Sequence, residues 1–129
     1  MKSFGFFVIL LFSSLAHGEP LDDCLSNVQN SPGTAYCYAK ELERLDKVLN
    51  TAYRKALNKI DGLDLAPETR KGVRNRLVEA QRNWIRFRDS DCTAVSDSID
   101  GTGAGIGGLE CNIQLTTHRI EELSRWDRW

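Results

Sequence analysis

The sequence has 129 residues, of which 41% are hydrophobic and 27% are charged, and its formal net charge is −1. This near balance excludes a strong general attraction to nucleic acid or to an anionic membrane. The length and composition indicate a single soluble domain.

The first 18 residues are typical of a secretory signal peptide. Lys2 precedes an almost continuous apolar run, Phe4–Phe12, which is too short to span a bilayer, and small residues follow that run. Cleavage after Gly18 fits this pattern best, and cleavage after Ala16 is a close alternative.

Export sets the expected organisation of the mature chain. A lipoprotein would need a small residue before its first cysteine, whereas two aspartates precede Cys24. We therefore expect a signal peptide at residues 1–18 and one domain at residues 19–129, periplasmic or secreted and not attached to a membrane after cleavage. Without Lys2 the chain has 16 basic and 18 acidic residues, a net charge of −2.

The first long helix is predicted to follow a polar segment. Residues 19–33 contain two prolines, which predicts an irregular segment with room for a short helical turn at Asp22–Val28. Thr34 can cap the next helix, which the spacing of apolar residues extends to about Ile60, before Asp61-Gly62 ends it. The positions expected to face inward are Tyr38, Leu42, Leu45, Leu49, Ala52, Tyr53 and Ala56, with Val48 and Leu57 beside them.

A second long helix is predicted from about Pro67 to Cys92. Proline at the first helical position and Glu68 in the first turn are typical of a helix start. Arg88 is expected next to Gln81, at the edge of the apolar stripe. Spacings of four, three, four and three place on one face Val73, Leu77, Ala80, Trp84 and Phe87.

A loop and a last helix complete the chain. Thr93–Gly108 contains five glycines among Ser, Thr and Asp, so we expect a long loop there. The last helix is predicted over about Leu109–Trp126, and no segment has the period of two that a strand would show. The fold class is therefore all-α: a small disulfide-stapled domain of three main helices with one long Gly-rich loop.

Four cysteines remain after the signal peptide, and an oxidising compartment favours disulfides over metal binding or nucleophilic chemistry. Three pairings are possible. The sequential pairing, Cys24–Cys37 and Cys92–Cys111, is favoured because it closes two short loops. Each bridge would then stabilise the fold by about 3 kcal/mol, and the second would clamp both ends of the expected loop.

The sequence offers few groups for catalysis. His118 is the one histidine outside the signal peptide, and no nucleophile and acid can be assigned to it. The cysteine spacing matches no zinc site, and neither a redox pair nor a phosphate-binding loop is present. We expect no enzyme activity, no metal and no cofactor, with a small hydrolase using His118 as base as the remaining enzymatic alternative.

A run of basic residues in the second long helix could suggest nucleic-acid binding. Glu68, Glu79 and Asp89 interrupt it, which favours a solvated helix face and no nucleic acid as partner. The run consists of Arg70, Lys71, Arg74, Arg76, Arg82 and Arg86.

Four short patterns occur in order along the chain. They are Leu45-Asp46…Leu49-Asn50…Tyr53, then Ala80-Gln81…Trp84…Phe87-Arg88-Asp89…Cys92, then Gly107-Gly108…Cys111, and finally Leu115-Thr116…Arg119-Ile120…Leu123. Together they cover nearly all of the mature chain and resemble the lysozyme inhibitor LprI-like N-terminal domain family of bacterial secreted proteins. The resemblance implies a small helical exported domain and, for at least one member, inhibition of lysozyme.

The shared residues of this resemblance are expected to form a scaffold. Helical register favours core packing of the aromatic residues over a sugar-binding platform. The scaffold residues are Asp46, Asn50, Tyr53, Gln81, Trp84, Arg88, Thr116 and Arg119.

Polar members of this scaffold need partners if they are half-buried. Arg88 could bind an anion, but we expect it to reach a carboxylate of the first long helix, either Asp46 or Glu41. Gln81 and Asn50 are expected to satisfy buried backbone groups or each other.

The loop is the remaining place for recognition. Asp97 and Asp100 give it an acidic character that suits a basic partner such as an animal-type lysozyme, with a tolerated surface insertion as the alternative. We therefore expect an exported non-enzymatic binding protein that could block the substrate cleft of a muramidase. The alternative function is an envelope interaction, immunity or accessory protein with a dedicated partner other than lysozyme.

Overall fold

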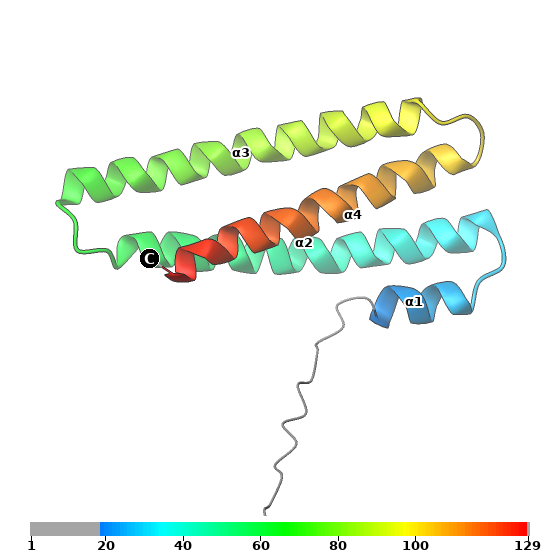
Figure 1. Cartoon of the computed structure of the whole chain (residues 1–129), viewed down its shortest axis with the longest axis horizontal. Coiled ribbons are helices and arrows are strands. Elements are labelled where there is room, and N and C mark those ends of the chain that lie inside the picture. The colour runs from blue at the N-terminus through cyan, green and yellow to red at the C-terminus, as the bar shows by residue number, and fades with distance from the viewer. Residues whose placement is uncertain (1–18, 129) are drawn as a thin grey trace, which may run out of the picture.

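The computed structural model describes residues 19–128, so the predicted signal peptide lies outside the described residues. Within this range the all-α fold class is confirmed, and no strand occurs (Figure 1). The three main helices are α2 (Ser31–Asp61), α3 (Pro67–Asp97) and α4 (Gly103–Ser124). A short helix, α1 (Glu19–Ser26), precedes them, and a 3₁₀ helix, η1 (Arg125–Arg128), follows them.

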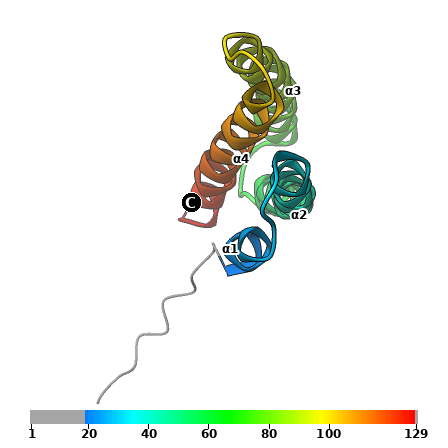
Figure 2. The same cartoon turned by 90° about the vertical axis from the view of Figure 1, so that its right-hand side faces the viewer.

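Helix α4 lies between α2 and α3 and packs against both of them (Figures 1 and 2). Helices α2 and α3 contact each other much less, and α1 packs against α2 alone among the described elements. The core therefore depends on α4, and it is formed by Leu49, Ala56, Leu57, Ile60, Leu77 and Leu123.

The start of the fold is more regular than predicted. The segment expected to be irregular contains α1, and Thr34 does not cap α2. Asn30 does so instead, because its Oδ1 accepts a hydrogen bond of 2.8 Å from the Gly33 N–H. The cap shifts the helix start to Ser31, while Asp61 ends the helix close to the predicted position.

The prediction of a long Gly-rich loop at Thr93–Gly108 is wrong. Helix α3 continues past Cys92 to Asp97, and α4 begins at Gly103 rather than Leu109, which leaves a turn of residues 98–102. In that turn Gly101 has a φ of 74°, which favours glycine.

Close packing explains two of the glycines inside α4, Gly107 and Gly108. A Cβ at Gly107 would collide with Ile99, and one at Gly108 would lie 3.1 Å from the Ser96 Cβ. The glycines therefore allow α4 to approach α3 closely, an effect that outweighs their low helix propensity.

The predicted apolar stripe of α3 is only partly correct. Ala80 is exposed, and Phe87 is 53% exposed. The buried face is rotated toward Leu77, Gln81 and Cys92. This rotation is possible because polar side chains of that face find partners on α2 and α4, as described below.

Two disulfides tie neighbouring helices together. Cys24–Cys37 joins α1 to α2, with a Cα–Cα distance of 5.7 Å, and Cys92–Cys111 joins α3 to α4, with a distance of 5.4 Å. The second bridge clamps two helices rather than the two ends of a long loop.

Candidate functional site

A tryptophan between two arginines lies at the junction of the three long helices. The Cζ atoms of Arg88 from α3 and Arg119 from α4 lie 5.2 and 5.8 Å from the centre of the Trp84 ring. Both arginine side chains are only 13% exposed. Such cation–π contacts strengthen when the cation is shielded from water.

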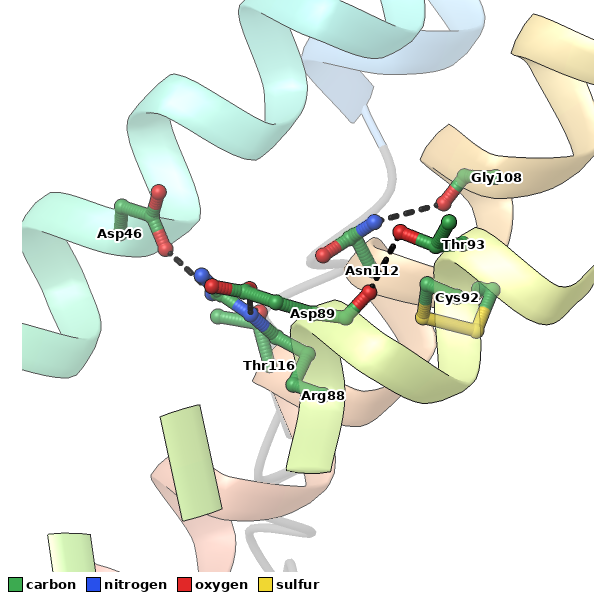
Figure 3. A network of polar contacts seen from close by, with 9 residues as sticks. Asp46, Arg88, Asp89, Cys92, Thr93, Gly108, Asn112 and Thr116 are labelled. Atoms are coloured by element: carbon green, nitrogen blue, oxygen red, sulfur yellow. Dashed lines mark hydrogen bonds and ion pairs between the residues drawn. A yellow bond between two sulfur atoms is a disulfide. The ribbon is translucent and has the colours of Figure 1, made fainter. Parts of the chain in front are cut away.

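Arg88 connects α3 to both other long helices (Figure 3). Its Nη1 donates to Asp46 Oδ1 of α2 at 2.9 Å and to Thr116 Oγ1 of α4 at 3.1 Å. Its Nε donates to the neighbouring Asp89 at 3.1 Å. Of the two expected carboxylates, Asp46 is therefore the partner, and Glu41 instead accepts two hydrogen bonds from Arg44.

Arg119 makes the second half of the network. Its Nε donates to Gln81 Oε1 at 2.9 Å, and its Nη1 donates to Glu122 at 2.8 Å. Gln81 and Asn50 were expected to satisfy buried backbone groups or each other, but Gln81 pairs with Arg119 and Asn50 is exposed on α2. Tyr53 packs against the core.

We call Asp46, Gln81, Trp84, Arg88, Thr116 and Arg119 the arginine network. Among the described residues, no buried side-chain nitrogen or oxygen lacks a hydrogen-bond partner. The network therefore has no buried polar atom left for a substrate, and it holds the helices together.

A different kind of surface occupies one end of the molecule. Residues 19–39 and 89–117 contain eight Asp and Glu and no Lys, Arg or His, while the rest of the chain from residue 40 has 16 basic and 10 acidic residues. The fold brings these segments together, because α1, the start of α2, the end of α3 and the start of α4 lie in the right-hand part of Figure 1. We call this region the acidic end.

A direct contact joins the two segments of the acidic end. The Tyr38 hydroxyl of α2 donates to Glu110 Oε1 of α4 at 2.7 Å. This hydrogen bond, together with partial burial, raises the pKa of Tyr38 above its usual value. A tyrosine is neutral at physiological pH even without this shift, so Tyr38 can donate to the carboxylate.

A shallow cleft of about 370 Å³ lies between α3 and α4 at the acidic end. Val95, Ile99 and Leu115 give it apolar walls, and Asp91 and Glu110 supply two exposed carboxylates. The Cys92–Cys111 bridge fixes the spacing of the two helices at this cleft.

The two predicted recognition residues also lie at the acidic end, and both are exposed. Asp97 is the last residue of α3, and Asp100 lies in the following turn. The sequence-based prediction named only Asp97 and Asp100 and missed the other acidic residues of this region. Their signal was present as two segments without a basic residue, but only the fold shows that they share one end.

Groups suited to catalysis are sparse in the residues that the structure describes. His118 is exposed on α4, and the four cysteines are all in disulfides. No cluster of three or more metal-binding side chains occurs between residues 19 and 128. No described helix combines the length and the apolar character that a membrane crossing needs.

Comparison with protein families gives one match. A family model described as "Lysozyme inhibitor LprI" matches residues 23–123. Neither the curated proteins nor the solved structures include a significant match.

Proposed function

Because the chain belongs to the lysozyme inhibitor LprI family, we propose that it binds a lysozyme through its acidic end and blocks the substrate cleft of that enzyme. The concentration of eight acidic and no basic residues in segments 19–39 and 89–117 is the observation that carries the choice of surface. A cationic lysozyme would be attracted to this end and repelled by the rest of the chain, which has an excess of basic residues.

The charges at the acidic end are available to a partner. Asp22, Asp23, Asp91, Asp97 and Asp100 are exposed, and none forms an ion pair within the described part of the chain. A carboxylate that has no partner in its own chain loses no internal ion pair when a partner's Lys or Arg binds it.

The cleft between α3 and α4 suits a long basic side chain. The aliphatic part of a lysine or arginine would pack on Val95, Ile99 and Leu115, while its charged end would reach Asp91 or Glu110. The disulfide and the short turn keep this surface in one shape, which lowers the entropy that binding costs.

Two disulfides and the family membership suit an extracytoplasmic protein. A protein in the periplasm or outside the cell can meet a lysozyme before it reaches peptidoglycan. We therefore place the proposed activity in one of those two locations.

The test is an inhibition assay with the mature protein. We would add it in micromolar excess to c-type, g-type and bacterial muramidases and follow the turbidity of a peptidoglycan suspension. We expect slower clearing with at least one cationic enzyme, and the effect should weaken as salt rises, because screening shortens the range of exposed charges.

A matched pair of triple variants tests the surface. D91N/D97N/D100N removes three exposed carboxylates from the acidic end, and D64N/E68Q/E79Q removes three exposed carboxylates elsewhere. We expect the first variant to lower affinity about tenfold or more and the second to change it little. Equal losses would refute docking through the acidic end, and no inhibition of any enzyme would refute the function itself. Capture of a different protein by an otherwise inactive chain would favour the envelope interaction alternative.

A further inference from the structure

An apolar groove runs along the seam between α2 and α4, on the side that α1 partly covers. Its volume is about 440 Å³. Past Val48 and Ile120 it continues into a second hollow of about 200 Å³ that reaches Ala52 and Leu123. The apolar lining of the first part comes from three helices: Leu21, Leu45, Val48, Ile113 and Ile120.

One end of this groove contains an arginine that is held by a buried carboxylate. Glu41 is 6% exposed and accepts hydrogen bonds of 2.8 and 2.6 Å from Nε and Nη2 of Arg44. These bonds raise the pKa of Arg44, so the guanidinium stays charged. They use two of its five N–H groups, and the side chain is still 37% exposed. Arg44 can therefore donate to an anion at the groove.

The other polar groups of the groove set a direction along it. Thr117 and Glu121 line it on α4, one to two turns beyond Ile113. The exposed Glu121 disfavours an anion at its own position and favours one at the Arg44 end. Lys55 and Asp127 lie at the far end of the second hollow and carry opposite charges.

We propose that this groove binds a fatty acid, with the carboxylate at Arg44 and the hydrocarbon chain along Leu45, Val48 and Ile120. The groove is long, is lined mostly by aliphatic side chains, and near one end offers the N–H groups of Arg44 that Glu41 leaves free, and these properties match a single-chain amphiphile with a carboxylate head group. Its volume is in the range of small-ligand sites, which combine apolar walls with a few placed polar groups.

Helix α1 provides a route of entry. It packs against α2 alone among the described elements, yet Leu21 reaches the groove. The Cys24–Cys37 bridge holds the last turn of α1 on α2. The turn of α1 that contains Leu21 can therefore move without breaking contacts between the long helices.

The experiment is a calorimetric titration of the mature protein with decanoate. Parallel titrations with decyltrimethylammonium and with decanol test a cationic and a neutral head group on the same hydrocarbon chain. We expect saturable binding of one decanoate, and about tenfold weaker binding of the other two, because a charge-assisted hydrogen bond to Arg44 is lost. Absence of decanoate binding, or equal binding of all three, would overturn the proposal. No lysozyme is present, so this result is independent of the proposed inhibition.

Two variants locate the site. E41Q/R44Q removes both charges of the groove pair without leaving a buried carboxylate unpaired, and E43Q/K47Q removes an exposed ion pair of the same helix as control. We expect only the first to lower decanoate affinity, by about tenfold.

Val48→Trp should abolish binding by filling the groove, and the 39% exposure of Val48 leaves room for the ring without disturbing the core. This second variant keeps the test decisive if E41Q/R44Q does not fold. Unchanged affinity in a folded Val48→Trp variant would exclude the groove as the site.

Discussion

The arginine network and the acidic end both contain charged side chains, but these lie in opposite environments. Arg88 and Arg119 are largely buried and hydrogen-bonded to three helices, whereas Asp97 and Asp100 are exposed and form no ion pair in the described chain. A paired and shielded charge stabilises the fold, and an exposed unpaired charge is free to meet a partner. Most of the polar residues that we expected to form the scaffold are of the first kind, with the exposed Asn50 as the exception, so we place the proposed site elsewhere.

The largest effect is expected from removing the bridge that joins α3 to α4 at the acidic end. C92S/C111S should lower the free energy of unfolding by about 3 kcal/mol, because a closed loop of this size restricts the unfolded chain. Denaturant unfolding checks this value. A change below about 1 kcal/mol would mean that helix packing alone fixes α3 against α4.

Breaking the arginine network should destabilise the protein by about 2 kcal/mol. Arg88→Ala removes hydrogen bonds to Asp46 and Thr116 and the contact with Trp84. Asp46 is still 44% exposed, so water can solvate its carboxylate and limit the loss. Arg86→Ala, an exposed arginine on the same helix, is the control and should change stability by less than about 0.5 kcal/mol.

Phe87 belongs to the predicted apolar stripe of α3 but not to its observed buried face, so its substitution distinguishes the two. Because the side chain is 53% exposed, Phe87→Ala should cost less than about 1 kcal/mol, whereas a core phenylalanine would cost about 3 to 5 kcal/mol. Thermal unfolding of the single variant suffices. A loss in the upper range would place Phe87 in the core.

The smallest expected change in the free energy of unfolding is a gain rather than a loss. Asp97 ends α3, whose last turn contains no basic residue, so its negative charge opposes the helix dipole. Asp97→Asn should therefore stabilise the fold by about 0.5 kcal/mol while weakening binding to a cationic partner. A destabilised Asp97→Asn variant would assign this residue to the scaffold.

Much of the fold could be predicted from local patterns. Pro67 and the apolar spacing located the start and the type of α3, and Asp61-Gly62 located the end of α2. Gly107 and Gly108 were misleading, because close packing against Ile99 and Ser96 favours glycine in a helix as much as a loop does. No local rule distinguishes these two uses.

The sequence predicted more of the arginine network than of the acidic end. Register and the need for a partner predicted that Arg88 reaches a carboxylate of the first long helix, but only the structure distinguishes Asp46 from Glu41. Phe87 was misplaced because an apolar residue can lie at the edge of a stripe while Gln81, bonded to Arg119, occupies its centre. The acidic end required the tertiary fold, since its two segments are separated by almost 50 residues.

The position of α4 has a consequence for synthesis. It is the last long helix of the chain, yet it supplies most of the contacts that hold α2 and α3 together. A chain that has emerged only as far as α3 has two amphipathic helices with few contacts between them. The domain therefore closes late, when the final helix is released, and its cysteine pairs can form between near neighbours in sequence while the rest of the chain is still open.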